Sequence, residues 1–167
     1  MFIDTVFFLL TVTCLCTDLA KRKIYNFVLL PAVLVALGYH LYTGGLPQVI
    51  LSLEGLSLGL ALLLIPHLMG GIGAGDVKFL AAIGALKGPS FIFITFLAGA
   101  IAGGILAIFY LVRNKKLLFT IKKLFLPFTV GFSFFQSYHT DSEVDQSSTI
   151  PYGAAIALGS AIAYFVR

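Results

Sequence analysis

The sequence predicts an all-α polytopic membrane protein: a six-transmembrane-helix bundle with one interfacial amphipathic helix. Composition is the first reason, because 59% of the 167 residues are hydrophobic and only 11% are charged. The mean hydropathy of +1.03 lies far above the range of soluble domains. The third reason is the number of apolar runs, since six helices at about 20 residues per span account for the length of the chain.

The spans are predicted in order from these runs, which occupy about residues 2–18, 26–42, 49–69, 77–87, 90–112 and 150–166. Glycine and proline in Tyr42 to Gln48 and in Lys87 to Ser90 predict turns. The fourth run is short, so we expect it to begin at the glycines before it, with its first turn buried in protein. Small residues four apart predict helix packing sites at Gly55/Gly59, Gly99/Gly103 and Gly159/Ala163. We expect residues 1–167 to form a single membrane-embedded domain, because no separate soluble domain fits.

The long connection between the last two runs, residues 113–149, has two unlike parts. Lys115 to Phe128 mixes lysine pairs with Leu, Ile and Phe. Adjacent lysines at mid-bilayer would be very costly, so we expect this segment to lie along the interface. An extra crossing within Leu124 to Phe135 would instead reverse the last span. Tyr138 to Thr149 is polar and predicted to be a solvated loop.

Basic residues predict the orientation. The first apolar run has basic residues after it and none before it, which indicates a retained helix with an outside N-terminus. If residues 113–149 do not cross, one side keeps only Lys87 and Arg167. The other side collects nine basic residues: Lys21, Arg22, Lys23, Lys78, Arg113, Lys115, Lys116, Lys122 and Lys123. That side is therefore predicted to be cytoplasmic. The net charge of +4 then reflects topology and gives no reason to expect nucleic acid.

Two aspartates fall at this predicted cytoplasmic face. Asp18 ends the first apolar run, and Asp76 begins the fourth, directly behind Gly73 and Gly75. A carboxylate at a membrane border is energetically costly and indicates chemistry. If the two helices pack together, the carboxyl groups share a proton, because close carboxylates cannot readily ionise together. One then acts as a base toward water while the other donates to a substrate carbonyl, which is the arrangement of an aspartic protease.

The helix ends favour a division of labour within the pair. Asp76 begins a helix and Asp18 ends one, so the helix dipoles favour Asp76 as the ionised partner. The basic residues 21–23 oppose this assignment by favouring a charged Asp18. Gly73 and Gly75 give backbone freedom and remove side-chain bulk, which would let an extended peptide come close to Asp76.

These residues resemble a known family. Gly73 to Gly84, which reads GAGDVKFLAAIG, resembles the GxGD motif of type IV prepilin leader peptidases, polytopic aspartic proteases of the bacterial inner membrane. Asp18 followed by Ile24-Tyr25-Asn26 is similar to the family's first catalytic aspartate and its downstream Ile-Pro-Asn, with Tyr25 in place of the proline. Ile150 to Ala157 resembles the family's C-terminal Pro-Tyr-Gly segment.

The resemblance implies that Asp18 and Asp76 are the catalytic pair of an endopeptidase. Its substrate would be a prepilin or pseudopilin embedded in membrane lipid, with its short basic leader removed at the cytoplasmic face. Larger family members carry an N-terminal region with paired CxxC motifs and also methylate the pilin. Nothing of that kind occurs here, so the chain resembles the small Flp/Tad-type peptidases and no methyltransferase activity is expected. The acidic residues Asp141, Glu143 and Asp145 form either a docking surface for the leader or a merely solvated loop.

Two other interpretations stay open. A small transporter or scaffold would use Asp18 and Asp76 as a proton or cation relay, which requires carboxylates at several depths. The remaining candidates, Asp4 and Glu54, are predicted near the opposite face, so no continuous path is evident. A catalytically inactive assembly factor of a pilus system would fit a pair held too far apart. The sequence has no CxxC pair, P-loop or Rossmann fingerprint, and no metal or cofactor is predicted.

Overall fold

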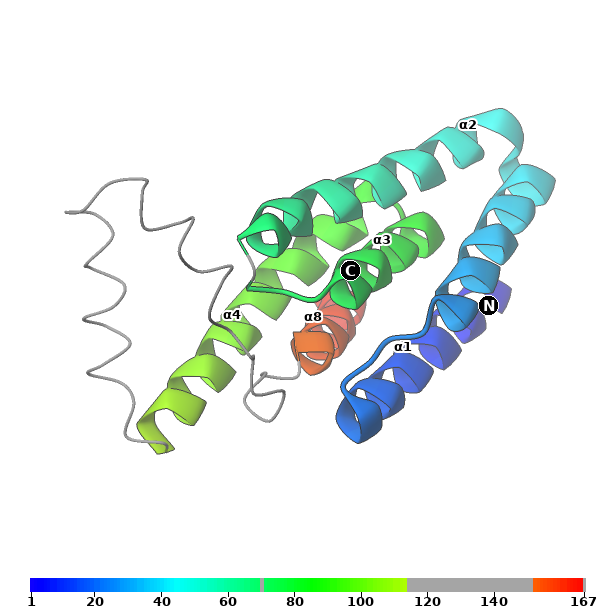
Figure 1. The fold of residues 1–167 in the computed structure, drawn as a ribbon. Helices are drawn as coiled ribbons and strands as arrows, with labels where there is room; N and C mark the ends of the chain where they lie inside the picture. Colours follow the sequence, from blue (N-terminus) through cyan, green and yellow to red (C-terminus); the bar gives the residue numbers. More distant parts are fainter. Residues whose placement is uncertain (70, 114–151, 167) are drawn as a thin grey trace. The chain divides into compact units, whose positions relative to one another are not determined.

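The computed structural model describes residues 1–69, 71–113 and 152–166, and this part of the chain is α-helical, as predicted (Figure 1). The helices are α1 (Phe2–Lys21), α2 (Asn26–Leu68), α3 (Ala74–Lys87), α4 (Pro89–Arg113) and α8 (Tyr152–Val166). The predicted interfacial helix, the possible extra crossing and the acidic loop lie outside the described residues. Met1–Gly103 and Pro151–Arg167 form one compact unit, and Gly104–Ile150 form a second. The single domain over residues 1–167 stays a prediction.

Helix α2 is bent at the predicted turn. Gly45 interrupts it with φ 65° and ψ −156°, a conformation that only glycine adopts readily. Pro47 follows two residues later and has no amide hydrogen, so it cannot make the hydrogen bond that a straight helix requires. The apolar runs 26–42 and 49–69 therefore form the two arms of one bent helix.

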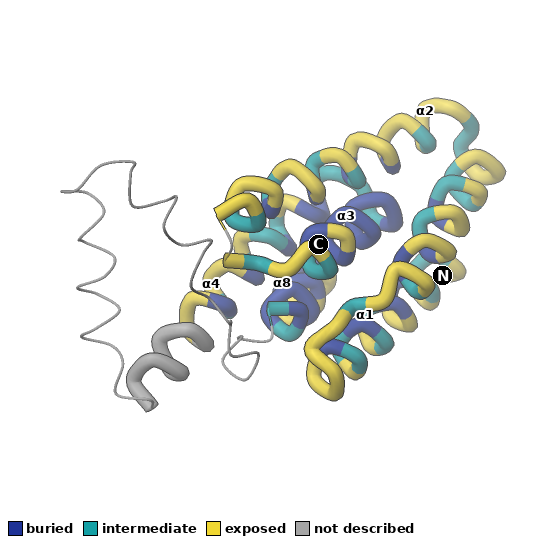
Figure 2. The backbone as a smooth tube through the Cα atoms, in the orientation of Figure 1, coloured by how far each residue is buried: buried dark blue, intermediate teal, exposed yellow. Residues whose placement is uncertain are grey.

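Helix α3 is buried over most of its length, where its tube is dark blue in Figure 2. It has only 14 residues, and nearly every side chain after its first turn is apolar and buried. A helix that is apolar all round must be covered all round. Contacts from α1, α2 and α8 provide this cover.

Glycines allow the second arm of α2 to approach α3 closely. A side-chain carbon at Gly55 would collide with the backbone of Gly84, and one at Gly59 would lie 2.7 Å from the Cα atom of Ala81. The Ser52 hydroxyl donates a hydrogen bond of 2.6 Å to a carbonyl oxygen of α3. The packing site predicted from the Gly55/Gly59 spacing is thus confirmed.

Helices α4 and α8 use the same device. A side-chain carbon at Gly159 would lie within 2.8 Å of the α4 backbone at Gly99. Gly99 in turn has the backbone of Ala155 against it. These contacts fix the first turn of α8 relative to α4, and that turn lies at the candidate site described below.

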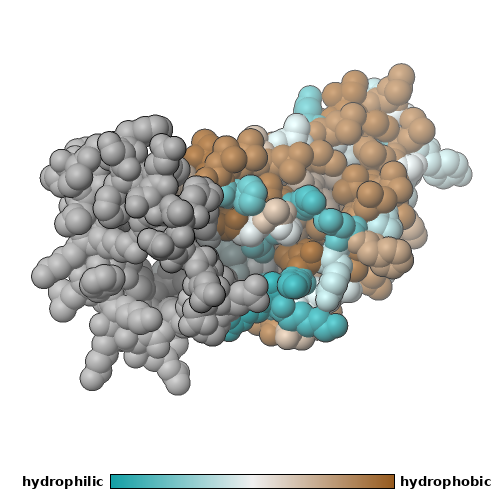
Figure 3. Space-filling model, in the orientation of Figure 1, coloured by the Kyte–Doolittle hydropathy of each residue, from teal (hydrophilic) through white to brown (hydrophobic). Residues whose placement is uncertain are grey.

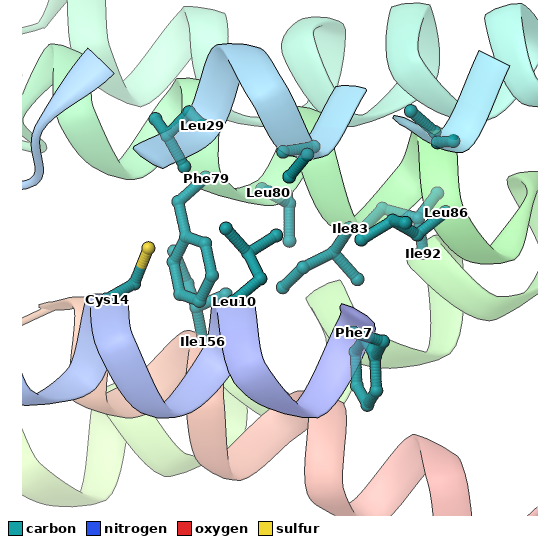
Figure 4. Close-up of a cluster of buried hydrophobic side chains, with 14 of the residues drawn as sticks. Phe7, Leu10, Cys14, Leu29, Phe79, Leu80, Ile83, Leu86, Ile92 and Ile156 are labelled. Atoms are coloured by element: carbon teal, nitrogen blue, oxygen red, sulfur yellow. The ribbon is translucent and has the colours of Figure 1, made fainter. Parts of the chain in front are cut away.

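Helix α1 packs against α2, α3 and α8. Its buried residues include Phe7, Leu10 and Cys14. Figure 4 shows Leu10 and Cys14 directed toward Phe79 of α3, within one cluster that also contains Ile156 of α8. The first turn of α1 is paired with the end of α3 through Asp4 and Lys87, and the last turn of α1 lies near the start of α3, so the two helices run in opposite directions.

On the face that Figure 3 shows, hydrophobic residues cover much of the surface of the described residues, with hydrophilic residues gathered near the middle. By length and composition, α1 and α2 are able to cross a membrane, and Pro89–Ile105 and Tyr152–Val166 are shorter apolar helices. Leucines, isoleucines and phenylalanines point outward from α1, α2 and α4, as expected where lipid is the solvent. The all-helical class is confirmed, and the number of six spans stays a prediction.

Candidate active site

Asp18 lies in the last turn of α1. The helix ends because Arg22 adopts the left-handed conformation, with φ 50°, and its amide donates a 2.8 Å hydrogen bond to the Asp18 carbonyl oxygen. The Asp18 residue is only 6% exposed. The helix end predicted from the sequence therefore turns this carboxyl group inward, into the bundle.

Asp76 is the third residue of α3, whose N-cap is Gly73. Its carboxyl group lies within hydrogen-bonding reach of the Gly73 amide, and Oδ2 is the oxygen on that side. This contact resembles half of a capping box, in which an acidic side chain in the first turn binds the N-cap amide. Asp76 Oδ1, however, is buried and has no hydrogen-bond partner among the described residues. Capping therefore uses one side of the carboxyl group and leaves the other available.

The structure brings the two aspartates together. Asp18 on α1 and Asp76 on α3 lie within electrostatic range of one another. Each keeps one buried oxygen without a hydrogen-bond partner among the described residues: Oδ2 of Asp18 and Oδ1 of Asp76. Such atoms are rare and destabilising unless water or a ligand satisfies them. Two of them, on neighbouring carboxyl groups from different helices, can bind and polarise a water molecule.

The first turn of α8 forms a third wall of the site. Gly153 is buried against the Asp18 carboxyl group, and the amides of Gly153 and Ala154 lie within hydrogen-bonding reach of it. Tyr152 lies within electrostatic range of Asp76, and its ring packs against Gly103 of α4. The sequence singled out this segment only through its family resemblance, because nothing in the local pattern shows which helix it faces.

What matters about Gly73 and Gly75 in this structure is that they have no side chain, and not an unusual backbone conformation. Positive φ values among the described residues occur only at Arg22, Gly45 and Gly88, so neither Gly73 nor Gly75 adopts a conformation reserved for glycine. A side-chain carbon at Gly73 would lie 3.2 Å from Asp76 Oδ2. Gly73 is exposed, and the close approach of an extended peptide there stays a prediction.

The segment after α1 contacts the glycine motif directly. A side-chain carbon at Gly75 would lie 3.1 Å from Cβ of Ile24. The Lys78 ammonium donates a 3.2 Å hydrogen bond to Oδ1 of Asn26. Ile24 and Asn26 therefore connect the two aspartate-bearing segments, a role that the sequence did not reveal because the partners are about 50 residues apart.

The described residues contain no group of three or more His, Cys, Asp or Glu side chains placed to hold a metal ion. Cys14 is buried and Cys16 exposed, so the two cysteines of α1 do not share a site.

Residues 5–108 match the type IV leader peptidase family. The match covers more than half of the chain and includes both aspartates, the Ile24 to Asn26 segment and the glycine motif. No curated protein and no solved structure matches the chain. The two-carboxylate geometry agrees with the aspartic-type chemistry of this family. The chain therefore belongs to the type IV leader peptidase family, a family of membrane-embedded aspartic-type peptidases.

Proposed function

We propose that this protein is an aspartic endopeptidase that removes the short basic leader from type IV prepilins or pseudopilins, with Asp18 and Asp76 as its catalytic residues. The observation that carries the proposal is the aspartate pair itself. The two carboxyl groups come from different helices, lie within electrostatic range, and each retain a buried oxygen without a partner among the described residues. A merely structural pair would be expected to satisfy its buried oxygens.

The reaction follows from one proton shared by the pair. The ionised aspartate takes a proton from water as the water oxygen bonds to the scissile carbonyl carbon, and the protonated aspartate donates its proton to the carbonyl oxygen. The result is a tetrahedral diol. The C–N bond then breaks, with its electrons and a proton from the first aspartate going to the leaving nitrogen. The second aspartate recovers the diol proton, so the pair returns to its starting state.

The membrane setting of the proposal is the cytoplasmic face of the bacterial inner membrane. The charge asymmetry of the sequence supports this orientation, because Lys21, Arg22, Lys23 and Lys78 belong to the same helix ends as the aspartate pair. Lys87 lies at the other end of α3. We retain the six-span bundle with an outside N-terminus as part of the proposal. It would place the pair where a prepilin helix leaves the lipid and its basic leader enters the cytoplasm.

The approach of the substrate is expected to be along the start of α3. Gly73 and Ala74 are exposed directly before the half-buried Asp76. Because Gly73 and Gly75 have no side chains to block its path, an extended peptide is predicted to come close to the carboxyl group there. The small Flp/Tad type without methyltransferase activity remains a part of this proposal that rests on the sequence.

The relay receives no support from the described residues. A proton or cation path requires further ionisable groups along the bilayer. Asp4 forms an ion pair with Lys87 at the far end of α3, and Glu54 is exposed on the outside of α2. Among the described carboxylates, the buried Asp18 and the half-buried Asp76 are the two that lie near each other.

The test is cleavage of a co-expressed candidate prepilin, read as a leader-sized mobility shift. Asp18→Asn and Asp76→Asn should each abolish processing while reaching normal membrane levels. Asp4→Asn is the matched control, because it removes an acidic residue from the same helix as Asp18 but from the opposite end, and it should process normally. Processing that persists in both site variants would show that the pair is structural.

A further inference from the structure

The space beside Gly153 is filled by the Asp18 carboxyl group. A side-chain carbon built at Gly153 would lie 2.6 Å from Oδ2, 2.9 Å from Cγ and 3.2 Å from Cβ of Asp18. Non-bonded carbon and oxygen atoms do not approach so closely in packed interiors. Any residue larger than glycine must therefore displace the carboxyl group itself.

A larger residue at Gly153 would move the Asp18 side chain and leave the helices in place. At Gly159, about 9 Å further along α8 by helix rise, the atoms in the way belong to the backbone of Thr95 and Gly99. At Gly153 they belong to one short side chain. The two glycines of α8 thus serve different ends: Gly159 permits helix packing, and Gly153 makes room for a functional group.

The first turn of α8 also supplies positive partial charge. Helix N-termini carry unpaired amides and the positive end of the helix dipole, both of which favour an anion. The amides of Gly153 and Ala154 are within hydrogen-bonding reach of Asp18, and the Arg22 side chain acts on it with the same sign. Asp18 is 6% exposed, and its Oδ2 has no hydrogen-bond partner among the described residues. Burial by itself disfavours the charged form of Asp18, and the amides at this helix terminus act against that cost.

We propose that Gly153 is a positioning residue of the active site: the first turn of α8 holds Asp18 as the ionised member of the pair, so that the shared proton resides on Asp76. This inference rests on the proposed function. It assigns water activation to Asp18 and protonation of the carbonyl oxygen to Asp76, the reverse of the assignment expected from the helix ends of α1 and α3 alone. Asp76 has one backbone amide within reach, that of Gly73, against two for Asp18.

The first experiment replaces Gly153 by alanine and measures cleavage of a purified prepilin in detergent. The expected result is a fall in kcat of about 100-fold, the usual consequence of moving a catalytic group by about 1 Å, with KM nearly unchanged. Gly38→Ala is the control, because nothing lies within 4 Å of a side-chain carbon there, and it should leave both constants unchanged. Gly159→Ala is the packing control and should lower thermal stability through its clash with α4.

A second readout does not depend on cleavage. Wild type and Gly153→Ala are treated with a carboxyl-directed carbodiimide, and labelling at Asp18 and Asp76 is measured by mass spectrometry. Displacement of Asp18 from the α8 amides should raise its labelling relative to Asp76, whereas a purely structural defect would raise both together. If the wild type cleaves no prepilin, the proposed function fails, and the labelling ratio still decides the role of α8.

Ala154→Pro replaces Gly153→Ala in both measurements if Gly153→Ala fails to accumulate in the membrane. Proline removes one amide hydrogen and is tolerated in the first turn of a helix. It should lower kcat about tenfold and raise the relative labelling of Asp18. Wild-type cleavage and a wild-type labelling ratio in either accumulated variant would overturn the proposal.

Discussion

Helices α1 and α3 are joined at both ends by charged residues, and the two junctions are opposite in kind. At one end, Asp18 and Asp76 place two carboxyl groups together, with two buried oxygens unpartnered among the described residues. At the other end, Asp4 and Lys87 form an ion pair with Nζ and Oδ1 2.5 Å apart. The helices are the same, so the difference lies in the electrostatics of each pair.

The Asp4–Lys87 junction is satisfied from several directions. The Lys87 ammonium lies 5.1 Å from the ring centre of Phe7, 5.8 Å from that of Phe91 and 5.0 Å from that of Tyr164. These contacts are within the range of cation–π attraction. Asp4 Oδ2 also lies 2.9 Å from the Met1 amino group. Opposite charges and aromatic faces therefore stabilise this end, whereas the aspartate end keeps reactive groups at the expense of stability. The following predictions test that contrast.

The largest effect is expected for the double variant Asp18→Asn/Asp76→Asn. Each single variant should cleave about 1,000-fold more slowly than the wild type, or slower still. The two losses of rate should not add, because the residues act as one catalytic unit, so the double variant should be no slower than either single variant. Thermal melting in detergent should occur at the wild-type temperature or higher, because the double variant no longer buries a charged carboxyl group. A double variant much slower than both singles would show that the residues act independently.

The second effect is on stability. Lys87→Met keeps an apolar stem among the three rings but removes the charge opposite Asp4, which should lower the unfolding free energy by about 2 kcal/mol, between the values typical of exposed and buried pairs. The melting temperature should fall by about 4–8 °C, and prepilin cleavage should persist at the permissive temperature. The exposed Lys23→Met serves as the control and should melt like the wild type. An inactive but stable Lys87→Met protein would contradict the division between the two ends.

The third effect concerns the hydroxyl group beside the aspartate pair. Tyr152→Phe keeps the ring against Gly103 and removes a hydrogen-bond donor near Asp76, so kcat should fall about tenfold, the size of one neutral hydrogen bond in the transition state. Tyr39→Phe in α2, where the ring stacks on Phe2, is the matched control and should cleave normally. Equal rates for both variants would place Tyr152 outside the chemistry.

The smallest effect is expected for Lys78→Met. Although Lys78 stands two residues after Asp76, its ammonium binds Asn26 at an exposed position. An exposed contact of this kind contributes about 0.5 kcal/mol, so cleavage should stay within about twofold. A double-mutant cycle with Asn26→Ala should give a coupling energy of about that size. A loss of activity as large as that of Asp76→Asn would assign the lysine a catalytic role.

Much of the fold follows from local patterns in the sequence. Gly45 and Pro47 mark the bend in α2 because one adopts a conformation closed to other residues and the other lacks an amide hydrogen. The ends of α1 and α3 follow from the change of polarity at Asp18 and Asp76. The small-residue spacing at Gly55 and Gly59 indicated a packing face without naming its partner, since a spacing describes one helix surface only.

Other features were beyond the sequence. Asp4 reads as a solvated residue near a chain end, yet it pairs with a lysine 83 positions away. Gly153 belongs to a segment that only the family resemblance singles out, and nothing in its sequence shows that it makes room for Asp18. Both contacts join segments that are far apart in the chain, and nothing in either segment's sequence indicates its partner.

The sequence by itself determined the membrane-type helical class, the two aspartates at helix ends and the family to which they point. Hydrophobicity and helix periodicity are properties of consecutive residues, so they can be read along one chain. Only the tertiary structure decided that α1 and α3 bring the aspartates together, that α8 places its first turn against Asp18, and that Lys87 neutralises Asp4. These pairings depend on which helix faces meet, and that choice is made by packing shape and by the burial of charge over the whole bundle.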